Sequence, residues 1–196
     1  MVGVNTDLHS QLALLSEILR QSEAIWAALS RAQSLGLPDY YIGAGCIAQT
    51  VWNHHTGAEA THGISDMDFV YYDNSDLSFE AEGAMIARIT DALAPCPLPL
   101  DIKNQARVHL WYPQHFGCGI APYPSLESAV NTWPTTATAV GVRLENNQLK
   151  VYAPFGLNDL FGMVVRANKA QITEAIYLQK VQKWRAKWPM LSVVPW

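Results

Sequence analysis

The feature that most constrains the fold is a strand, a glycine turn and a helix that follow one another between residues 39 and 53. Residues 39–42 favour a short strand, and Gly43-Ala44-Gly45 supplies the turn. Residues 47–53 then place apolar side chains at helical spacing. A chain that combines strands and helices in this way packs its helices on a sheet, so we expect a mixed α+β fold.

Two acidic residues lie in the next predicted strand, over residues 66–72. Asp66 and Asp68 are two positions apart, and side chains with that spacing on a strand point to the same face. Two carboxylates this close repel one another unless a cation lies between them. A hard divalent ion such as Mg²⁺ suits the pair because it prefers carboxylate oxygens. A water-exposed pair beside a turn is the alternative interpretation.

Amphipathic helices are predicted on both sides of this region. Residues 7–35 repeat apolar side chains at steps of three and four, which predicts one or two helices that end at Gly36 and Pro38. Ser78 is suited to cap a further helix that continues to about Leu93, where a proline-rich stretch ends it.

The second half of the chain predicts shorter elements. Residues 100–112 alternate apolar and polar side chains over a length that exceeds one ordinary strand, so we expect two strands or a break near Asn104. The remaining patterns predict a short helix over 125–131, a hairpin of 137–144 with 148–152, and two final helices over 157–165 and 172–188.

Charge is divided unevenly along the 196 residues, whose formal net charge is −4. Residues 1–97 hold 3 basic and 12 acidic residues, and residues 98–196 hold 10 basic and 5 acidic residues. A cleft between the two halves would place a metal site on one wall and an anionic ligand on the other. The acidic balance gives no strong nucleic-acid signal, although it leaves a local basic patch possible.

The composition is that of a protein with a substantial core, because 49% of the residues are hydrophobic and only 15% are charged. The N-terminal residues lack the basic start and apolar stretch of a signal peptide, and no apolar run is long enough to span a membrane. We therefore expect a cytoplasmic protein without membrane association. Its three cysteines have no paired spacing, which favours reduced thiols over a zinc site or a disulfide framework.

A third acid, Asp101, lies among the polar positions of residues 100–112, together with Lys103, Arg107 and His109. The order of a glycine turn, an acidic strand and a third acid on the following strand resembles the DNA polymerase β-like nucleotidyltransferase superfamily. Within it, the chain is similar to a branch of small bacterial nucleotidyltransferase family proteins. That similarity covers residues 43–45, 49–53, 65–68, 71–73, 104–111 and 153–157.

The resemblance implies a nucleotidyltransferase fold, with a short mixed β-sheet, helices on one face, and further helices at both ends of the chain. It also implies that Asp66, Asp68 and Asp101 are catalytic residues that bind Mg²⁺ or Mn²⁺. The expected reaction transfers a nucleoside monophosphate from a nucleoside triphosphate (NTP) to an acceptor hydroxyl and releases pyrophosphate. The acceptor, a small molecule or a macromolecule, is left open, as is the nucleotide base.

Further residues are candidates for binding the substrates. The glycine turn offers backbone N–H groups to phosphate oxygens. Two basic side chains at the polar positions of residues 100–112 are suited to stabilise the negative charge of a phosphate. The nucleotide-binding candidates are Gly43, Ala44, Gly45, Cys46, Lys103 and Arg107, and His109 is a possible substrate-binding residue. We interpret the Cys46 thiol as a packed small side chain. Lys180, Lys183, Arg185 and Lys187 would hold an anionic acceptor or form a solvated helix face.

We expect a single domain over residues 1–196, with an N-terminal helical segment (1–38), a catalytic core (39–112) and a C-terminal hairpin with helices (113–196). A catalytically silent nucleotide-binding or antitoxin-like regulatory module with the same fold is the alternative to an enzyme. The complete set of three acids favours the enzyme.

Overall fold

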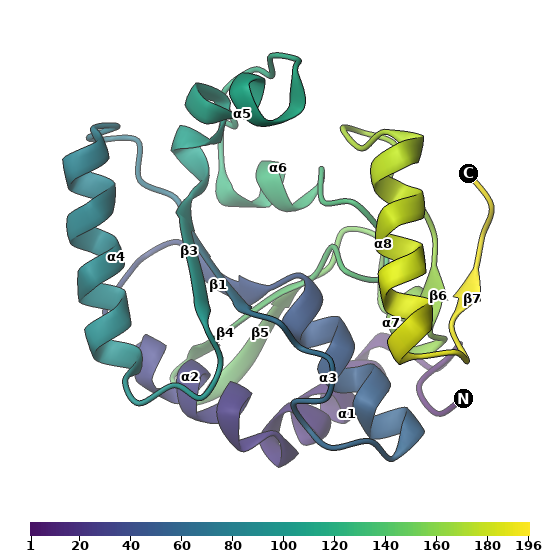
Figure 1. Ribbon diagram of the computed structural model, residues 1–196. Helices are drawn as coiled ribbons and strands as arrows, with labels where there is room; N and C mark the ends of the chain where they lie inside the picture. The colour runs from purple at the N-terminus through teal and green to yellow at the C-terminus, as the bar shows by residue number, and fades with distance from the viewer.

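The computed structural model describes all residues from 1 to 196, and a five-stranded sheet forms its centre (Figure 1). The strand order is β3-β2-β1-β4-β5. The β2–β3 pair is parallel, and the other three neighbouring pairs are antiparallel, so the sheet is mixed. The strands are β1 (Tyr40–Gly43), β2 (Met67–Tyr71), β3 (Leu100–Asn104), β4 (Gly141–Glu145) and β5 (Gln148–Tyr152).

Four helices cover one face of this sheet. They are α1 (Leu8–Gln21), α2 (Glu23–Gln33), α3 (Gly45–Thr56) and α4 (Phe79–Leu93). Helix α2 contacts β4, α3 contacts β1 and β2, and α4 contacts β3, while α1 packs on α2 and α3. The main hydrophobic core lies between these helices and the sheet. Ser78 caps α4 by accepting a hydrogen bond from the N–H of Ala81, as its sequence position predicts.

The alternation of side chains along β2 decides which residues enter that core. Met67, Phe69 and Tyr71 belong to the main core, whereas Asp68 and Val70 lie on the opposite face. The two faces of β2 therefore alternate with the expected two-residue period, and Asp68 points away from α1–α4.

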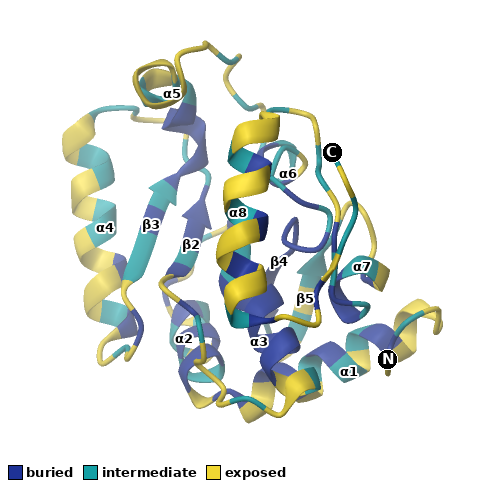
Figure 2. Ribbon diagram, turned by 45° about the vertical axis from the view of Figure 1, so that its right-hand side comes forward, coloured by how far each residue is buried: buried dark blue, intermediate teal, exposed yellow.

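Shorter elements border the opposite face of the sheet. They are the 3₁₀ helix η1 (Gln105–Arg107), α5 (Val108–Phe116), α6 (Leu126–Val130), α7 (Asn158–Phe161), α8 (Glu174–Lys187), and the strand pair β6 (Val164–Val165) and β7 (Ser192–Val193). Helix α6 packs Leu126 and Val130 on Tyr41 and Val70. Helix α8 exposes one side to solvent and buries the other against the body of the protein (Figure 2).

The mixed α+β class with a mixed sheet is confirmed, and so is the break near Asn104, where β3 ends. The alternative of a second strand in residues 100–112 is wrong, because Asn104 accepts a hydrogen bond from the N–H of Ala106 and starts η1, after which α5 follows. The helix predicted over 157–165 ends at Phe161, and Val164–Val165 pairs instead with β7. No helix is both long enough and apolar enough to cross a lipid bilayer.

Candidate active site

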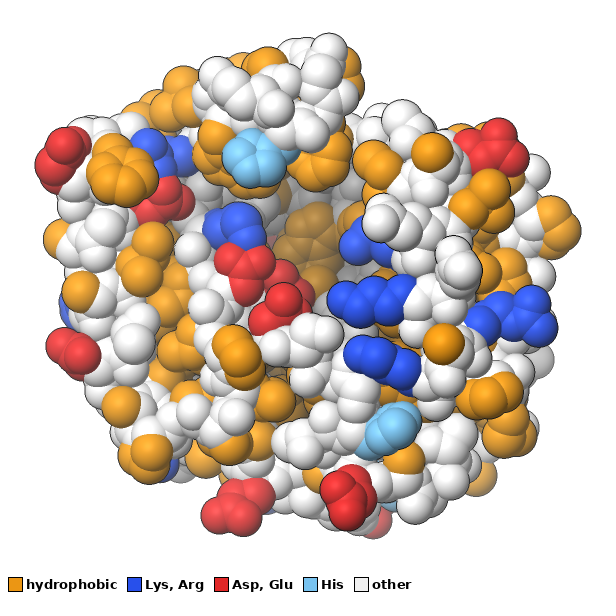
Figure 3. Space-filling view, viewed as in Figure 1, with side chains coloured by type: hydrophobic (Ala, Val, Ile, Leu, Met, Phe, Trp, Pro, Cys, Tyr) orange, Lys and Arg blue, Asp and Glu red, His pale blue; other side chains and the backbone are white.

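A cavity of about 680 Å³ opens on the sheet face that α1–α4 leave uncovered. Its walls come from the start of α3, the strands β2 and β3, helix α5, residues 132–138 and helix α8. In the space-filling view, acidic side chains lie on one side of this hollow and Lys or Arg side chains on the other (Figure 3). The two walls correspond to the two halves of the chain only in part, because Asp101 and Lys103 of residues 98–196 lie on the acidic side with Asp68.

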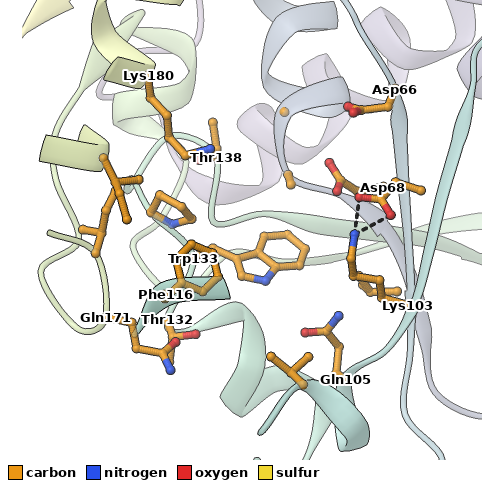
Figure 4. Close-up of a pocket in the computed structure, with 18 of the residues that line it drawn as sticks. Asp66, Asp68, Lys103, Gln105, Phe116, Thr132, Trp133, Thr138, Gln171 and Lys180 are labelled. Carbon is orange, nitrogen blue, oxygen red and sulfur yellow. Dashed lines mark hydrogen bonds and ion pairs between the residues drawn. The ribbon is translucent and has the colours of Figure 1, made fainter. Parts of the chain in front are cut away.

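The three predicted acids all line this cavity. Asp68 of β2 and Asp101 of β3 are direct neighbours in the parallel ladder, so their side chains lie on the same face. Asp66 precedes β2 by one residue, and both it and Asp68 point into the cavity (Figure 4). The structure thus brings together three carboxylates that span 36 positions of the chain.

The surroundings of Asp68 change its protonation. Burial raises the pKa of Asp68 to about 7, and the negative charges of Asp66 and Asp101 add to the increase. The positive charges of Lys103 and Lys180 act against it. Asp68 is therefore costly to ionise in the free protein, and a bound cation would offset that cost.

Lys103 occupies the space next to Asp101. Its Nζ contacts both carboxylate oxygens of Asp101, and both side chains remain partly exposed. No three His, Cys, Asp or Glu side chains are gathered closely enough to share one metal ion, although the three acids line one cavity. The donor set nevertheless fits a hard divalent cation, because it offers several carboxylate oxygens and no softer ligand.

The glycine turn places Ala44 and Gly45 on the cavity wall. Ala44 adopts a strained backbone conformation with φ 55° and ψ −131°, and its N–H donates to the Val140 carbonyl oxygen at 2.9 Å. The N–H of Ala44 is therefore not free to bind a phosphate oxygen. The first-turn N–H groups of α3, which starts at Gly45, have no acceptor within the helix and remain the backbone donors for a phosphate.

Gly43 and Cys46 contribute packing at this turn rather than cavity surface. A Cβ atom on Gly43 would lie 2.7 Å from the Val140 carbonyl oxygen and 2.8 Å from the Trp133 ring, so the position has no room for a side chain. The Cys46 thiol is buried and donates to the Gly43 carbonyl oxygen at 3.0 Å. Burial raises the pKa of this thiol, which agrees with its interpretation as a packed small residue.

Arg107 and His109 lie outside the cavity, which corrects their expected positions. Arg107 is in η1 rather than on a strand, so it does not share the face of Asp101. Its guanidinium is buried in an ion pair with Glu82 and donates from Nε to the Leu77 carbonyl oxygen at 2.9 Å. His109 belongs to α5 and does not line the cavity. Of the two cations predicted to bind phosphate, only Lys103 faces the site.

The structure adds residues that the sequence patterns did not single out. Trp133 and Gln171 line the cavity from segments without helical or strand periodicity, so no local signal marked them. Aromatic side chains of α5 also line it: Trp111, Tyr112 and Phe116. On α8, Lys180 and Lys183 line the same cavity, although Lys183 is also exposed to solvent. Burial lowers the pKa of Lys180, and the charges of Asp68 and Asp66 partly counter this.

The chain is similar to known proteins in its family and its fold. A solved structure described as "a CCA-adding enzyme head domain" is 27% identical, with a TM-score of 0.74, over 92% of this chain and 96% of that one. A "CCA-adding enzyme apo form I" is 14% identical with a TM-score of 0.49, and the chain spans 42% of its length. None of the curated proteins matches the chain significantly. The model of a family described as "Nucleotidyltransferase" matches residues 30–193, so the chain belongs to that nucleotidyltransferase family.

Proposed function

We propose that the protein transfers a nucleoside monophosphate from an NTP to an acceptor hydroxyl, with Mg²⁺ or Mn²⁺ held by Asp66, Asp68 and Asp101. The observation that carries this proposal is the placement of three carboxylates in one cavity, two of them as neighbours on one sheet face. Membership of a nucleotidyltransferase family supports the same chemistry.

The unusual protonation of Asp68 fits a cation-binding role. In the free protein its carboxylate is destabilised by burial and by two neighbouring acids. When bound, divalent ions would stabilise the charge on the attacking and leaving oxygens of the transferred phosphoryl group. Asp101 would first have to release Lys103, whose Nζ then becomes free to contact phosphate oxygens.

The residues of the chain would divide the remaining work. Asp101 accepts the proton of the acceptor hydroxyl, whose oxygen forms a bond to the α-phosphorus of the NTP. The bond between that phosphorus and the bridging oxygen breaks, and pyrophosphate leaves with the electron pair. The first-turn N–H groups of α3 and the ammonium groups of Lys180 and Lys183 attract the triphosphate and hold it against the carboxylates.

The acceptor class remains part of the proposal. RNA ends belong among the acceptors to be tested, because the similar structure of higher identity is described as a CCA-adding enzyme head domain. Lys180 and Lys183 also give the cavity positive charge that no acidic side chain neutralises through a salt bridge. Small molecules with a free hydroxyl are the competing class.

A labelling experiment tests this function directly. Purified protein is incubated with each labelled NTP, Mg²⁺ or Mn²⁺, and a cell lysate or an RNA pool. The inactive variant is Asp66→Ala plus Asp68→Ala, and Glu80→Ala plus Asp91→Ala on the exposed side of α4 is its control for lost charge. The proposal is supported if the wild type and the control transfer label and the inactive variant does not.

Two other outcomes lead elsewhere. NTP binding by the wild type without transfer of label to any acceptor would favour the silent nucleotide-binding module. Equal transfer by the wild type and the Asp66→Ala plus Asp68→Ala variant would show that these carboxylates are not the catalytic groups.

A further inference from the structure

Trp133 forms part of the cavity wall directly beside the carboxylates. Gly43 of β1 is the ladder neighbour of Asp68, and a Cβ atom on Gly43 would lie 2.8 Å from Cη2 of the Trp133 ring and 2.9 Å from Cζ3. The six-membered ring of the indole therefore rests on the backbone next to Asp68. Figure 4 shows Trp133 between the acidic residues on one side and Gln171 and Lys180 on the other.

The protein holds this indole in place without covering it. Asn168 donates from Nδ2 to the carbonyl oxygens of Trp133 at 2.9 Å and of Asn131 at 2.7 Å. The backbone N–H of Trp133 donates to the Val130 carbonyl oxygen at 3.1 Å. The ring packs on the small cluster of Tyr41, Val70, Leu126 and Val130, yet Trp133 is only half-buried and lines the cavity. A fixed, partly open aromatic ring is suited to stacking on a planar ligand.

A second group, Gln171, is oriented beside this ring. The Tyr123 hydroxyl lies 2.6 Å from Oε1 of Gln171, to which it donates, and 3.0 Å from Oγ1 of Thr132, the residue before Trp133. Tyr123 is itself anchored, because its carbonyl oxygen accepts a hydrogen bond from the Tyr72 hydroxyl at 2.9 Å. This arrangement leaves the Nε2 amino group of Gln171 without a partner in the protein. Gln171 therefore presents a hydrogen-bond donor to the cavity.

We infer that Trp133 is the stacking platform for the nucleobase of the NTP and that Gln171 donates a hydrogen bond to an acceptor atom on the edge of that base. The inference rests on the proposed function, because it requires the triphosphate to lie at the neighbouring carboxylates. It adds a specificity element: a nucleotide binds with its base on Trp133, whereas a bare polyphosphate contacts only the charged walls. Stacking of a base on an aromatic side chain accounts for about a five- to 150-fold gain in affinity.

The test compares the binding of NTPs with that of inorganic tripolyphosphate, each with Mg²⁺, by isothermal titration calorimetry. The wild type is expected to bind at least one NTP about five- to 150-fold more tightly than tripolyphosphate. Trp133→Ala should remove that preference and leave tripolyphosphate binding unchanged, and Trp133→Phe should retain most of it. Trp26→Ala, which changes a tryptophan of α2 outside the cavity, is the matched control and should keep the full preference.

Gln171 is tested by the ranking of the four NTPs. Gln171→Leu should reduce the differences in Kd among them, because it removes the donor while keeping the shape of the side chain. Thermal unfolding of each variant shows whether it is folded. Where Trp133→Ala is not folded, Trp133→Leu replaces it, because leucine is a larger apolar side chain that has no aromatic ring for stacking.

The outcomes separate this inference from the proposed function. Equal binding of NTP and tripolyphosphate by the wild type would overturn the base platform and leave the proposed transfer standing. The same holds if the preference over tripolyphosphate persists in Trp133→Ala, or if the differences in Kd among the four NTPs are unchanged in Gln171→Leu. Failure of the wild type to bind any NTP would overturn both.

Discussion

Replacing Asp68 by asparagine should stabilise the metal-free protein at neutral and alkaline pH. The pKa of Asp68 is raised from 3.8 to about 7, first by burial and then by the charges of Asp66 and Asp101. Between pH 4 and pH 7 the folded state therefore holds a proton that the unfolded state has released. Stability falls as the pH rises through this window and stays low above pH 7, because ionised Asp68 is tolerated better in the unfolded chain.

The size of the effect follows from the pKa difference. Each pKa unit corresponds to about 1.4 kcal/mol, so the full shift corresponds to about 4 kcal/mol, and local rearrangement around the charge reduces this to about 2 to 4 kcal/mol. Asparagine stays neutral at every pH, so the variant avoids the loss. We expect Asp68→Asn to gain this amount over the wild type between pH 4 and pH 8, and to lose the ability to be stabilised by Mg²⁺.

Urea unfolding in EDTA at several pH values measures this difference. Asp91→Asn removes one exposed carboxylate from α4 and is the control for net charge, with an expected change close to zero across the same range. A gap between Asp68→Asn and the wild type that stays constant from pH 4 to pH 8 would refute the reasoning, because it would show that Asp68 does not ionise at a cost in the folded state.

Three further changes test separate parts of the structure. Lys103→Met should raise the affinity for Mg²⁺ about three- to tenfold in calorimetric titrations, because it frees Asp101 and removes a positive charge; weaker binding would contradict this. Gly43→Ala should lower the free energy of unfolding in urea by about 1 to 3 kcal/mol, since its Cβ would crowd the Val140 carbonyl oxygen at 2.7 Å, and unchanged stability would argue against the packing described. Arg107→Met should lower the free energy of unfolding by about 3 kcal/mol, because it breaks the buried ion pair with Glu82. The folded protein should still bind NTP with the affinity of the wild type. Loss of NTP binding with unchanged stability would instead support the predicted role of Arg107 in phosphate binding.

The error at Arg107 shows where reading a local pattern fails. Residues 100–112 alternate apolar and polar side chains, and such a pattern over a few residues is compatible with either a strand or a short helix. The Asn104 side chain and the ion pair of Arg107 with Glu82 decide for η1 and α5. The ion pair depends on α4, which precedes β3 in the chain, so residues 100–112 alone do not encode it.

Trp133 and Gln171 show a different limit. Each lies in a loop, and they meet in the cavity although they are 38 positions apart in the sequence. Tyr123, a third loop residue, orients Gln171. No spacing rule connects these three positions, because loops follow no fixed period and their side chains are placed by the elements that they join.

By itself, the sequence determined most of the local elements and the face of β2 on which Asp68 lies. The two-residue period of a strand places Asp68 opposite to Met67 and Phe69 whatever the rest of the chain does. Only the tertiary structure decided that β3 pairs in parallel with β2 so that Asp101 lies beside Asp68, and that α8 brings its lysines across the cavity from them. The physical reason is that strand register and helix placement are set by burial of the whole core, to which distant segments contribute together.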